Sequence, residues 1–459
     1  LAHLILINVL VGAILFSGIR AGYAQDEQPS GPVYLVQEGD TLISIALQFG
    51  VTVNDLLVAN NMSLSDLLFI GTPIVIPGLE GVTGILETRT IPYGETLRSL
   101  SRHYQVPMEK LVQLNRLVSP WELYAGSSLI LPVSPNEAPQ SKRVVLAQGQ
   151  SVLELAVREN ANPWNLANTN LLSSPGRTLP GDVLVVPEQA MSGPGGFPSP
   201  VTAIQISNFF QGETGVIHIS ATDGISFQGN LLDHLFTFFP AEPGQYAGLQ
   251  GVHALAEPGL HALAIQGTLP DGSIFIHSQP VLVRPRGYLF ESITVPPALI
   301  DPETTNQEED FIRPLVNQVT PQKYWQGLFL SPSPCPTCIN SGFGNRRSYN
   351  GSAFTYFHGG VDFPPVAIEI TASADGVVVF ADFLEVRGNF TLIDHGWGVL
   401  SAYMHQAELF VQPGETVRAG QVIGLIGSTG RSTGAHLHWE IWVGGVQVNP
   451  LYWLDTEYP

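Results

Sequence analysis

The sequence predicts a multidomain α+β chain, with three βααβ modules, an antiparallel β-sandwich and a mostly antiparallel β domain in that order. Its 459 residues are too many for one hydrophobic core. A set of landmark residues recurs three times in the amino-terminal part. Beyond it, short runs that alternate between apolar and polar residues are separated by turns rich in Gly and Pro, which is typical of antiparallel strands.

The composition indicates a folded chain and argues against a nucleic-acid partner. Hydrophobic residues make up 44% and charged residues 13% of the sequence, which fits neither a disordered nor a multispanning chain. The formal net charge is -20 at pH 7, and the sequence has no basic stripe. We therefore expect no binding to nucleic acid.

The amino terminus predicts export. Residues Leu4 to Phe16 are almost wholly apolar, and Gly22-Tyr23-Ala24 offers small residues where a signal peptidase cuts. We expect residues 1–24 to be a signal peptide cleaved after Ala24, which leaves no membrane span. The alternative is an uncleaved membrane anchor, for which the apolar run is short.

The landmark residues define an internal repeat of 55 residues. In the first copy, strands at Tyr34–Val36 and Ile74–Pro77 flank two helices, with Thr41 as the N-cap of the first helix. The three sets of landmarks are Gly39, Asn60, Gly71 and Pro77; Gly94, Asn115, Gly126 and Pro132; and Gly149, Asn170, Gly181 and Pro187. The predicted modules are residues 33–78, 90–133 and 143–188.

With turns such as Gly39-Asp40-Thr41-Leu42, these repeats resemble LysM modules. The resemblance implies binding to N-acetylglucosamine-containing glycans such as peptidoglycan. The third copy is divergent, because Gln150-Ser151-Val152 replaces the usual Asp-Thr-Leu, and a spacer is the alternative role for it. A solenoid-like scaffold is the structural alternative for the whole array.

Residues 201–286 predict an antiparallel β-sandwich, with runs such as Gly215-Val216-Ile217-His218-Ile219 between turns. The pattern resembles an immunoglobulin-like domain. Residues 287–318 are expected to be a linker, because Thr294 to Glu309 combines Pro296-Pro297 with an acidic run typical of a solvated segment.

The only two cysteines are Cys335 and Cys338. In an exported chain this spacing favours a small-loop disulfide. A redox pair and half of a zinc knuckle are the alternatives.

Candidate metal ligands lie in three separated segments near the carboxy terminus. The segments are His358-Gly359-Gly360-Val361-Asp362, Tyr403-Met404-His405 and His436-Leu437-His438. Alternation along a strand puts His436 and His438 on one face, which favours a metal site or an acid–base pair. The glycine turn lets His358 and Asp362 reach one ion, and a histidine from a distant strand completes three ligands. Two further histidines can then transfer protons. The absence of HExxH excludes the helix-borne zincin arrangement.

These segments, with Ile393-Asp394-His395-Gly396 and the run from Gly427 to Glu440, resemble the M23 (LytM/lysostaphin-type) zinc endopeptidases over Ser341–Leu454. The predicted peptidase domain is residues 319–459. The resemblance implies one Zn2+ per chain, and stem or cross-link peptides of peptidoglycan as substrate. The implied metal ligands are His358, Asp362 and His438, and the implied catalytic pair is His405 and His436. We expect His395 to be structural, and Glu440 either to support the ligand strand or to form a surface salt bridge.

The combined expectation is an exported, wall-associated zinc endopeptidase that hydrolyses peptidoglycan peptides and is held on glycan by LysM modules. The first alternative is a non-catalytic LytM-type activator of a cell-wall amidase. The second is a purely structural wall-adhesion protein. The presence of all five site residues argues against both.

Overall fold

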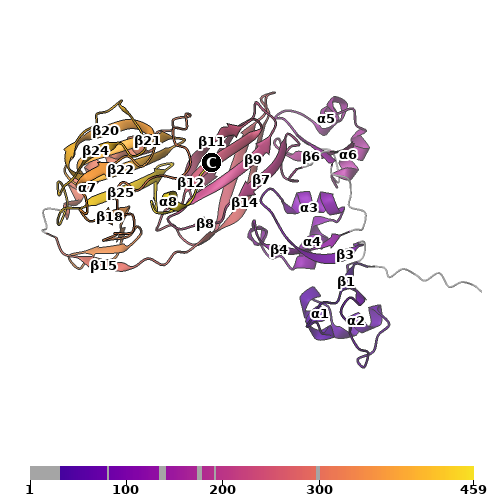
Figure 1. Ribbon diagram of the computed structural model, residues 1–459. Helices are drawn as coiled ribbons and strands as arrows, with labels where there is room; N and C mark the ends of the chain where they lie inside the picture. The colour runs from indigo at the N-terminus through magenta and orange to yellow at the C-terminus, as the bar shows by residue number, and fades with distance from the viewer. Residues whose placement is uncertain (1–30, 80–81, 134–140, 173–177, 191–192, 296–299) are drawn as a thin grey trace, which may run out of the picture. The chain divides into compact units, whose positions relative to one another are not determined.

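The computed structural model describes residues 31–79, 82–133, 141–172, 178–190, 193–295 and 300–459, which divide into two compact units at Gly84/Ile85 (Figure 1). The described residues form many strands and few helices, as predicted. Residues 1–24, expected to be a signal peptide, lie outside them. No single helix among the described residues is long and apolar enough to span a membrane; α1 and α2 pass that test only as a pair bent by 101°.

Each repeat has the predicted strand–helix–helix–strand order, and its two strands pair antiparallel. The first contains β1 (Val33–Leu35), α1 (Leu42–Phe49), α2 (Val53–Ala59) and β2 (Pro73–Val75). The second contains β3 (Ile85–Thr90), α3 (Leu97–Tyr104), α4 (Met108–Asn115), the 3-10 turn η1 (Pro120–Glu122) and β4 (Ser128–Val133). The third contains β5 (Ser141–Val145), α5 (Val152–Arg158), α6 (Pro163–Thr169) and β6 (Val183–Ala190).

The repeated asparagine has the same structural role in all three copies. In the first copy, Asn60 Nδ2 donates to the carbonyl oxygens of Leu56 at 2.8 Å and Val75 at 2.9 Å, and its Oδ1 accepts from Val75 N at 2.7 Å. Asn115 and Asn170 make the same three bonds in the other copies. The asparagine amide thus pairs with a backbone carbonyl of the second helix and with both backbone groups of one residue in the closing strand. These three bonds tie the helix to the strand.

The region after the repeats forms antiparallel strands around one apolar core. The strands are β7 (Val201–Ile206), β8 (Phe209–Phe210), β9 (Thr214–Ala221), β10 (Ser226–Leu231), β11 (His234–Glu242), β12 (Gln245–Gly251), β13 (Gly259–Thr268) and β14 (Ile274–Arg284). Their hydrogen-bonding order is β7-β9-β12-β11-β10-β13-β14-β8, and only the β14–β8 pair is parallel. Phe227, Leu263 and Phe275 are among the residues of the core.

The prediction of a solvated linker at residues 287–318 is wrong. This segment contains β15 (Phe290–Ile293) and the fifteen-residue helix α7 (Pro302–Val316). Asp301 caps the helix, accepting from Thr304 N at 2.8 Å, and Pro302 occupies its first turn. Glu308, Ile312 and Val316 recur every four residues and are buried. One face of the helix is therefore buried, although the stretch as a whole is acidic.

The carboxy-terminal region is mostly antiparallel β, as predicted. Its strands are β16 (Arg346–Tyr349), β17 (Tyr356–Phe357), β18 (Val361–Phe363), β19 (Glu369–Thr371), β20 (Gly376–Leu384), β21 (Gly388–Gly396), β22 (Val399–Leu409), β23 (Thr416–Val417), β24 (Val422–Ile426), β25 (Leu437–Val443) and β26 (Val446–Val448), followed by the short helix α8 (Tyr452–Asp455). The main sheet has the order β18-β25-β22-β21-β20-β23. Cys335 and Cys338 form the predicted disulfide.

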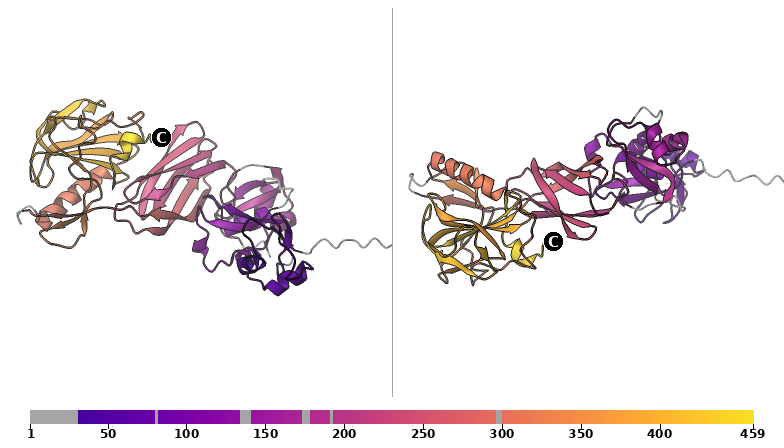
Figure 2. Two further views of the ribbon diagram at one scale, coloured as in Figure 1. Left: turned by 60° about the horizontal axis from the view of Figure 1, so that its bottom comes forward. Right: turned by 90° about the horizontal axis from the view of Figure 1, so that it is seen from above.

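Helix α7 belongs to this region, and Figure 2 shows it lying against the carboxy-terminal strands. Its Ile312 and Val316 share a core with Phe390, Leu400 and Trp442 of the sheet. β15 pairs in parallel with β16. The segment between the two β regions is therefore an integral part of the second one.

Helix α7 should contribute measurably to the stability of this region. We expect Ile312→Ala to lower the free energy of unfolding by about 2–5 kcal/mol, because it empties a fully buried position. The exposed Asn306→Ala on the same helix should change it by less than about 0.5 kcal/mol. Urea unfolding followed by tryptophan fluorescence measures this, since Trp325, Trp397, Trp439, Trp442 and Trp453 all lie in the region. Equal midpoints for the two variants would contradict a packed helix.

Candidate active site

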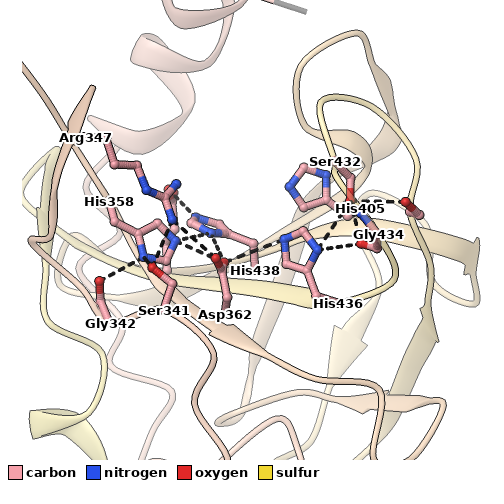
Figure 3. A network of polar contacts seen from close by, with 12 residues as sticks. Ser341, Gly342, Arg347, His358, Asp362, His405, Ser432, Gly434, His436 and His438 are labelled. Atoms are coloured by element: carbon pink, nitrogen blue, oxygen red, sulfur yellow. Dashed lines mark hydrogen bonds and ion pairs between the residues drawn. The ribbon is translucent and has the colours of Figure 1, made fainter. Parts of the chain in front are cut away.

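The pairing of three strands brings the predicted site residues together. β25 pairs with β18 on one side and β22 on the other, in registers that set His438 opposite Asp362 and opposite Met404. His405 follows Met404 in the chain, and His436 comes directly before β25. Residues far apart in the sequence thereby reach one place on the sheet (Figure 3).

His358 reaches the site through the two glycines that follow it. A Cβ at Gly360 would overlap the carbonyl oxygen of Trp439, so the chain passes β25 at a distance that glycine alone permits. This passage puts the rings of His358 and His438 4.8 Å apart between centroids.

Three donor atoms converge at the centre of the site. His358 Nε2 lies 3.0 Å from Asp362 Oδ1 and 2.9 Å from His438 Nδ1, and these last two atoms are 2.8 Å apart. All three side chains are largely buried. Two imidazole nitrogens and a carboxylate oxygen are donors that a catalytic Zn2+ takes from a protein. The residues present therefore fit a zinc ion.

Neighbouring acceptors set the tautomers of the two imidazoles. His358 Nδ1 lies 2.9 Å from the carbonyl oxygen of Gly342, which can only accept, so this nitrogen carries the proton. His438 Nε2 lies 3.0 Å from Glu440 Oε1 and donates to it. The nitrogens that face the centre are therefore left with lone pairs, as metal ligation requires.

The electrostatics of the centre favour a cation. Burial alone would raise the pKa of Asp362, but the interactions with His358 and His438 hold that pKa well below its usual range. Burial alone would lower the pKa of His438, yet hydrogen bonds and charge from Asp362 and Glu440 raise it to about 9. The carboxylate is thus ionised near neutrality, and a metal ion at His438 competes with a strongly held proton.

His405 and His436 form a second pair beside the three donors, with ring centroids 4.8 Å apart. Each donates from Nδ1 to a backbone carbonyl oxygen at 2.8 Å, that of Thr429 for His405 and that of Gly434 for His436. Their Nε2 atoms are left as acceptors, and His436 Nε2 lies 3.7 Å from Asp362 Oδ1. Burial, followed by the nearby histidines, lowers the pKa of His405 to about 3, so this ring is neutral at physiological pH.

The backbone of His405 is held in an uncommon conformation. Its φ is 62°, in the left-handed region that costs a non-glycine residue about 1–2 kcal/mol. The register of β22 with β21 shifts at this point, which marks a β-bulge. Bulges often turn a side chain toward an active site, and this one occurs at a predicted catalytic residue.

The alternatives for Glu440 are resolved by its surroundings. It is buried and accepts from Trp442 Nε1 at 2.8 Å and from Gln447 Nε2 at 2.7 Å, besides holding His438. A surface salt bridge is therefore excluded. His395 is structural, as predicted: its two ring nitrogens contact the carbonyl oxygen of Asp375 at 2.8 Å and Ser401 Oγ at 2.7 Å.

Sequence reasoning missed two residues that support Asp362. Arg347 Nη2 lies 3.4 Å from Asp362 Oδ2 and donates to Ser341 Oγ at 3.0 Å. Glu291, on β15, accepts from Asn345 Nδ2 at 2.6 Å and pairs with Arg347 at 3.3 Å. Neither residue lies in one of the three segments that contain the predicted ligands. Glu291 also lies in the segment that was expected to be a linker.

Two family models match parts of the chain. Residues 34–77 and 90–132 match the LysM domain, and residues 356–450 match Peptidase family M23. The chain thus contains two of the three predicted LysM domains and the predicted M23 peptidase region. The LysM matches cover the first two repeats and not the third.

Curated relatives align with only a part of the chain. The peptidoglycan DD-endopeptidase ShyC of Vibrio cholerae is 38% identical over 113 residues, which are 24% of this chain and 26% of that protein. The DD-carboxypeptidase/endopeptidase Mpg of Neisseria meningitidis is 45% identical over 117 residues, 25% of this chain and 26% of that protein. The chain thus matches about a quarter of the length of either relative.

A search of solved structures finds a putative peptidase M23 from Pseudomonas aeruginosa. It is 20% identical, with a TM-score of 0.41, over 53% of this chain and 94% of that structure.

Zinc retention tests the three-donor centre. We expect His438→Ala to lose the bound ion, because one of three donors disappears. Glu440→Gln should weaken zinc affinity about 10- to 100-fold, since it removes the charge that orients and polarises His438. Competition with a chromophoric chelator measures both. The matched control is His218→Ala, which removes an exposed histidine elsewhere in the chain; equal affinity in all three variants would rule out this centre.

Proposed function

We propose that this chain is an exported zinc-dependent endopeptidase that hydrolyses peptide bonds of bacterial peptidoglycan. The observation that carries this proposal is the convergence of His358 Nε2, His438 Nδ1 and Asp362 Oδ1 beside a second pair of histidines, one of which places its Nε2 3.7 Å from Asp362 Oδ1. The M23 match over residues 356–450 supports the same chemistry. The name of ShyC, a peptidoglycan DD-endopeptidase, points to peptidoglycan as the substrate.

In this proposal His358, Asp362 and His438 hold one Zn2+ per chain. An ion held by these three residues would supply Lewis-acid chemistry, lowering the pKa of a water and polarising a carbonyl. Burial and the nearby histidines lower the pKa of His405 to about 3, so its ring is neutral. We assign its Nε2 the role of hydrogen-bond acceptor and proton-transfer group for water. His436 lies beside His405 and offers a second Nε2 for proton transfer or for a hydrogen bond to the substrate.

We assign the remaining parts of the chain to attachment and spacing. LysM repeats at 33–78 and 90–133 would hold the enzyme on wall glycan, and the shared asparagine bridge supports residues 143–188 as a third, divergent LysM. Residues 201–286, with antiparallel strands around one core, would be an immunoglobulin-like sandwich. Residues 1–24 would direct export to the wall, and residues 319–459 with α7 would be the peptidase.

Hydrolysis of purified peptidoglycan tests this function. We expect the full chain to release new amino termini, and a chelator to abolish the release. His405→Ala and His436→Ala should each lower the rate by about 10²- to 10⁴-fold, because each removes a proton-transfer group. His218→Ala, outside the site, should cleave at the rate of the unaltered chain.

The same assay addresses the alternative function. If the chain binds zinc but releases no termini from several types of wall, the endopeptidase assignment fails. An increase in the rate of an added amidase would then identify a non-catalytic activator.

A further inference from the structure

A short turn between β20 and β21, at residues 385–387, contacts both parts of the chain that hold His405. Arg387 O accepts from His405 N at 2.9 Å, and Val386 O accepts from Arg431 N at 2.8 Å. Arg431 follows two residues after Thr429, whose carbonyl oxygen accepts from His405 Nδ1. The backbone and the ring of His405 therefore both depend on where this turn lies.

The turn is fixed from outside the sheet by one carboxylate. Glu308, on α7, accepts from Val386 N at 2.7 Å through Oε2. Its Oε1 accepts from Arg387 N at 3.1 Å and from Arg387 Nη1 at 2.7 Å. Both Glu308 and Arg387 are at least nine-tenths buried. Three charge-assisted hydrogen bonds in a buried place hold the turn rigidly.

His405 needs such support because its conformation is unfavourable by itself. Its left-handed φ persists only where the surrounding structure over-determines the backbone. The hydrogen bond to Arg387 O secures its amide, while the bond to Thr429 O sets its ring. A looser turn would release the first constraint and weaken the second.

We propose that Glu308 is a positioning residue that orients His405 through the turn at 385–387. This inference rests on the proposed function, in which His405 transfers a proton. It makes α7, in the segment that connects the two β regions, a determinant of catalytic rate. Glu308 itself touches neither the three-donor centre nor the substrate side of His405.

The neighbouring Glu309 provides a matched control. It pairs with Arg387 Nη2 at 2.8 Å but bonds no backbone amide of the turn. Its side chain is 45% exposed. Loss of negative charge near Arg387 is common to Glu308→Gln and Glu309→Gln, whereas loss of the buried backbone contacts is specific to the first.

Kinetics on purified peptidoglycan give the first readout. We expect Glu308→Gln to lower kcat about tenfold to a hundredfold, because a small displacement of a catalytic group has effects of that size. KM and bound zinc should stay at the values of the unaltered chain, since the donors of the centre do not move. Glu309→Gln should stay within about twofold of it in all three quantities.

The Nδ1–H signal of His405 gives a second readout that does not depend on activity. In the full chain labelled with 15N-histidine, it is assigned by its loss in His405→Ala. We expect Glu308→Gln to broaden or shift this signal and Glu309→Gln to leave it unchanged. An unchanged signal in Glu308→Gln would overturn the proposal, whether or not kcat falls. If the signal shifts in Glu308→Gln but the unaltered chain itself cleaves no peptidoglycan, the proposed function fails and the positioning role of Glu308 stands.

Discussion

The close approach of three ligand atoms at the centre of the site is the constraint on which the rest of the region depends. His358 Nε2, His438 Nδ1 and Asp362 Oδ1 lie within 2.8–3.0 Å of one another, and the outer hydrogen bonds of both rings direct lone pairs inward. Burial alone would lower the pKa of His438, but hydrogen bonds and charge from Asp362 and Glu440 raise it to about 9, so this ring can hold a proton. A divalent ion bound by the same three ligand atoms would replace that proton.

The rest of the region serves to keep those atoms in place. The carbonyl oxygens of Gly342, Thr429 and Gly434 each accept from one imidazole, so the loop before β16 and the loop between β24 and β25 set three tautomers of the site. Carboxylates form the next layer: the buried Glu440 accepts from His438, and the partly exposed Glu291 pairs with the arginine that contacts Asp362. Because the bond between His438 and Glu440 is buried, losing it would leave an unpaired polar group.

The three repeats share their internal structure but differ in their contacts with the rest of the chain. All three copies keep the asparagine bridge, yet the second is docked on the neighbouring sheet. Tyr93 Oη donates to the carbonyl oxygen of Leu263 at 2.8 Å, and Ala125 N to that of Pro280 at 2.9 Å. In the first copy Ile70, the counterpart of Ala125, is 71% exposed. Equivalent positions therefore differ in their surroundings: Ala125 hydrogen-bonds to the neighbouring sheet, whereas Ile70 faces solvent.

The sequence by itself determined the local features of this protein. The 55-residue period predicted the strand–helix–helix–strand order of each repeat, because caps, turns and the bridging asparagine act within a few dozen residues. Spacing within a segment predicted that His358 can lie near Asp362 and His436 near His438, because these residues are close in sequence or follow strand alternation. The resemblance to the M23 family joined all five residues, with His405, in one site, and the structure brings them together although His358 and His438 lie 80 residues apart.

Only the tertiary structure decided which residues support the site. Glu308 lies 79 residues from Arg387, and Glu291 lies 56 residues from Arg347, so no periodicity relates them. Glu291 and Glu308 both lie in residues 287–318, which the sequence predicted to be a solvated linker. Composition led to that prediction because it cannot distinguish an exposed glutamate from one that is paired inside the protein. The partners became visible when β15 and α7 packed against the sheet, since burial, and not residue type, gives a carboxylate its role.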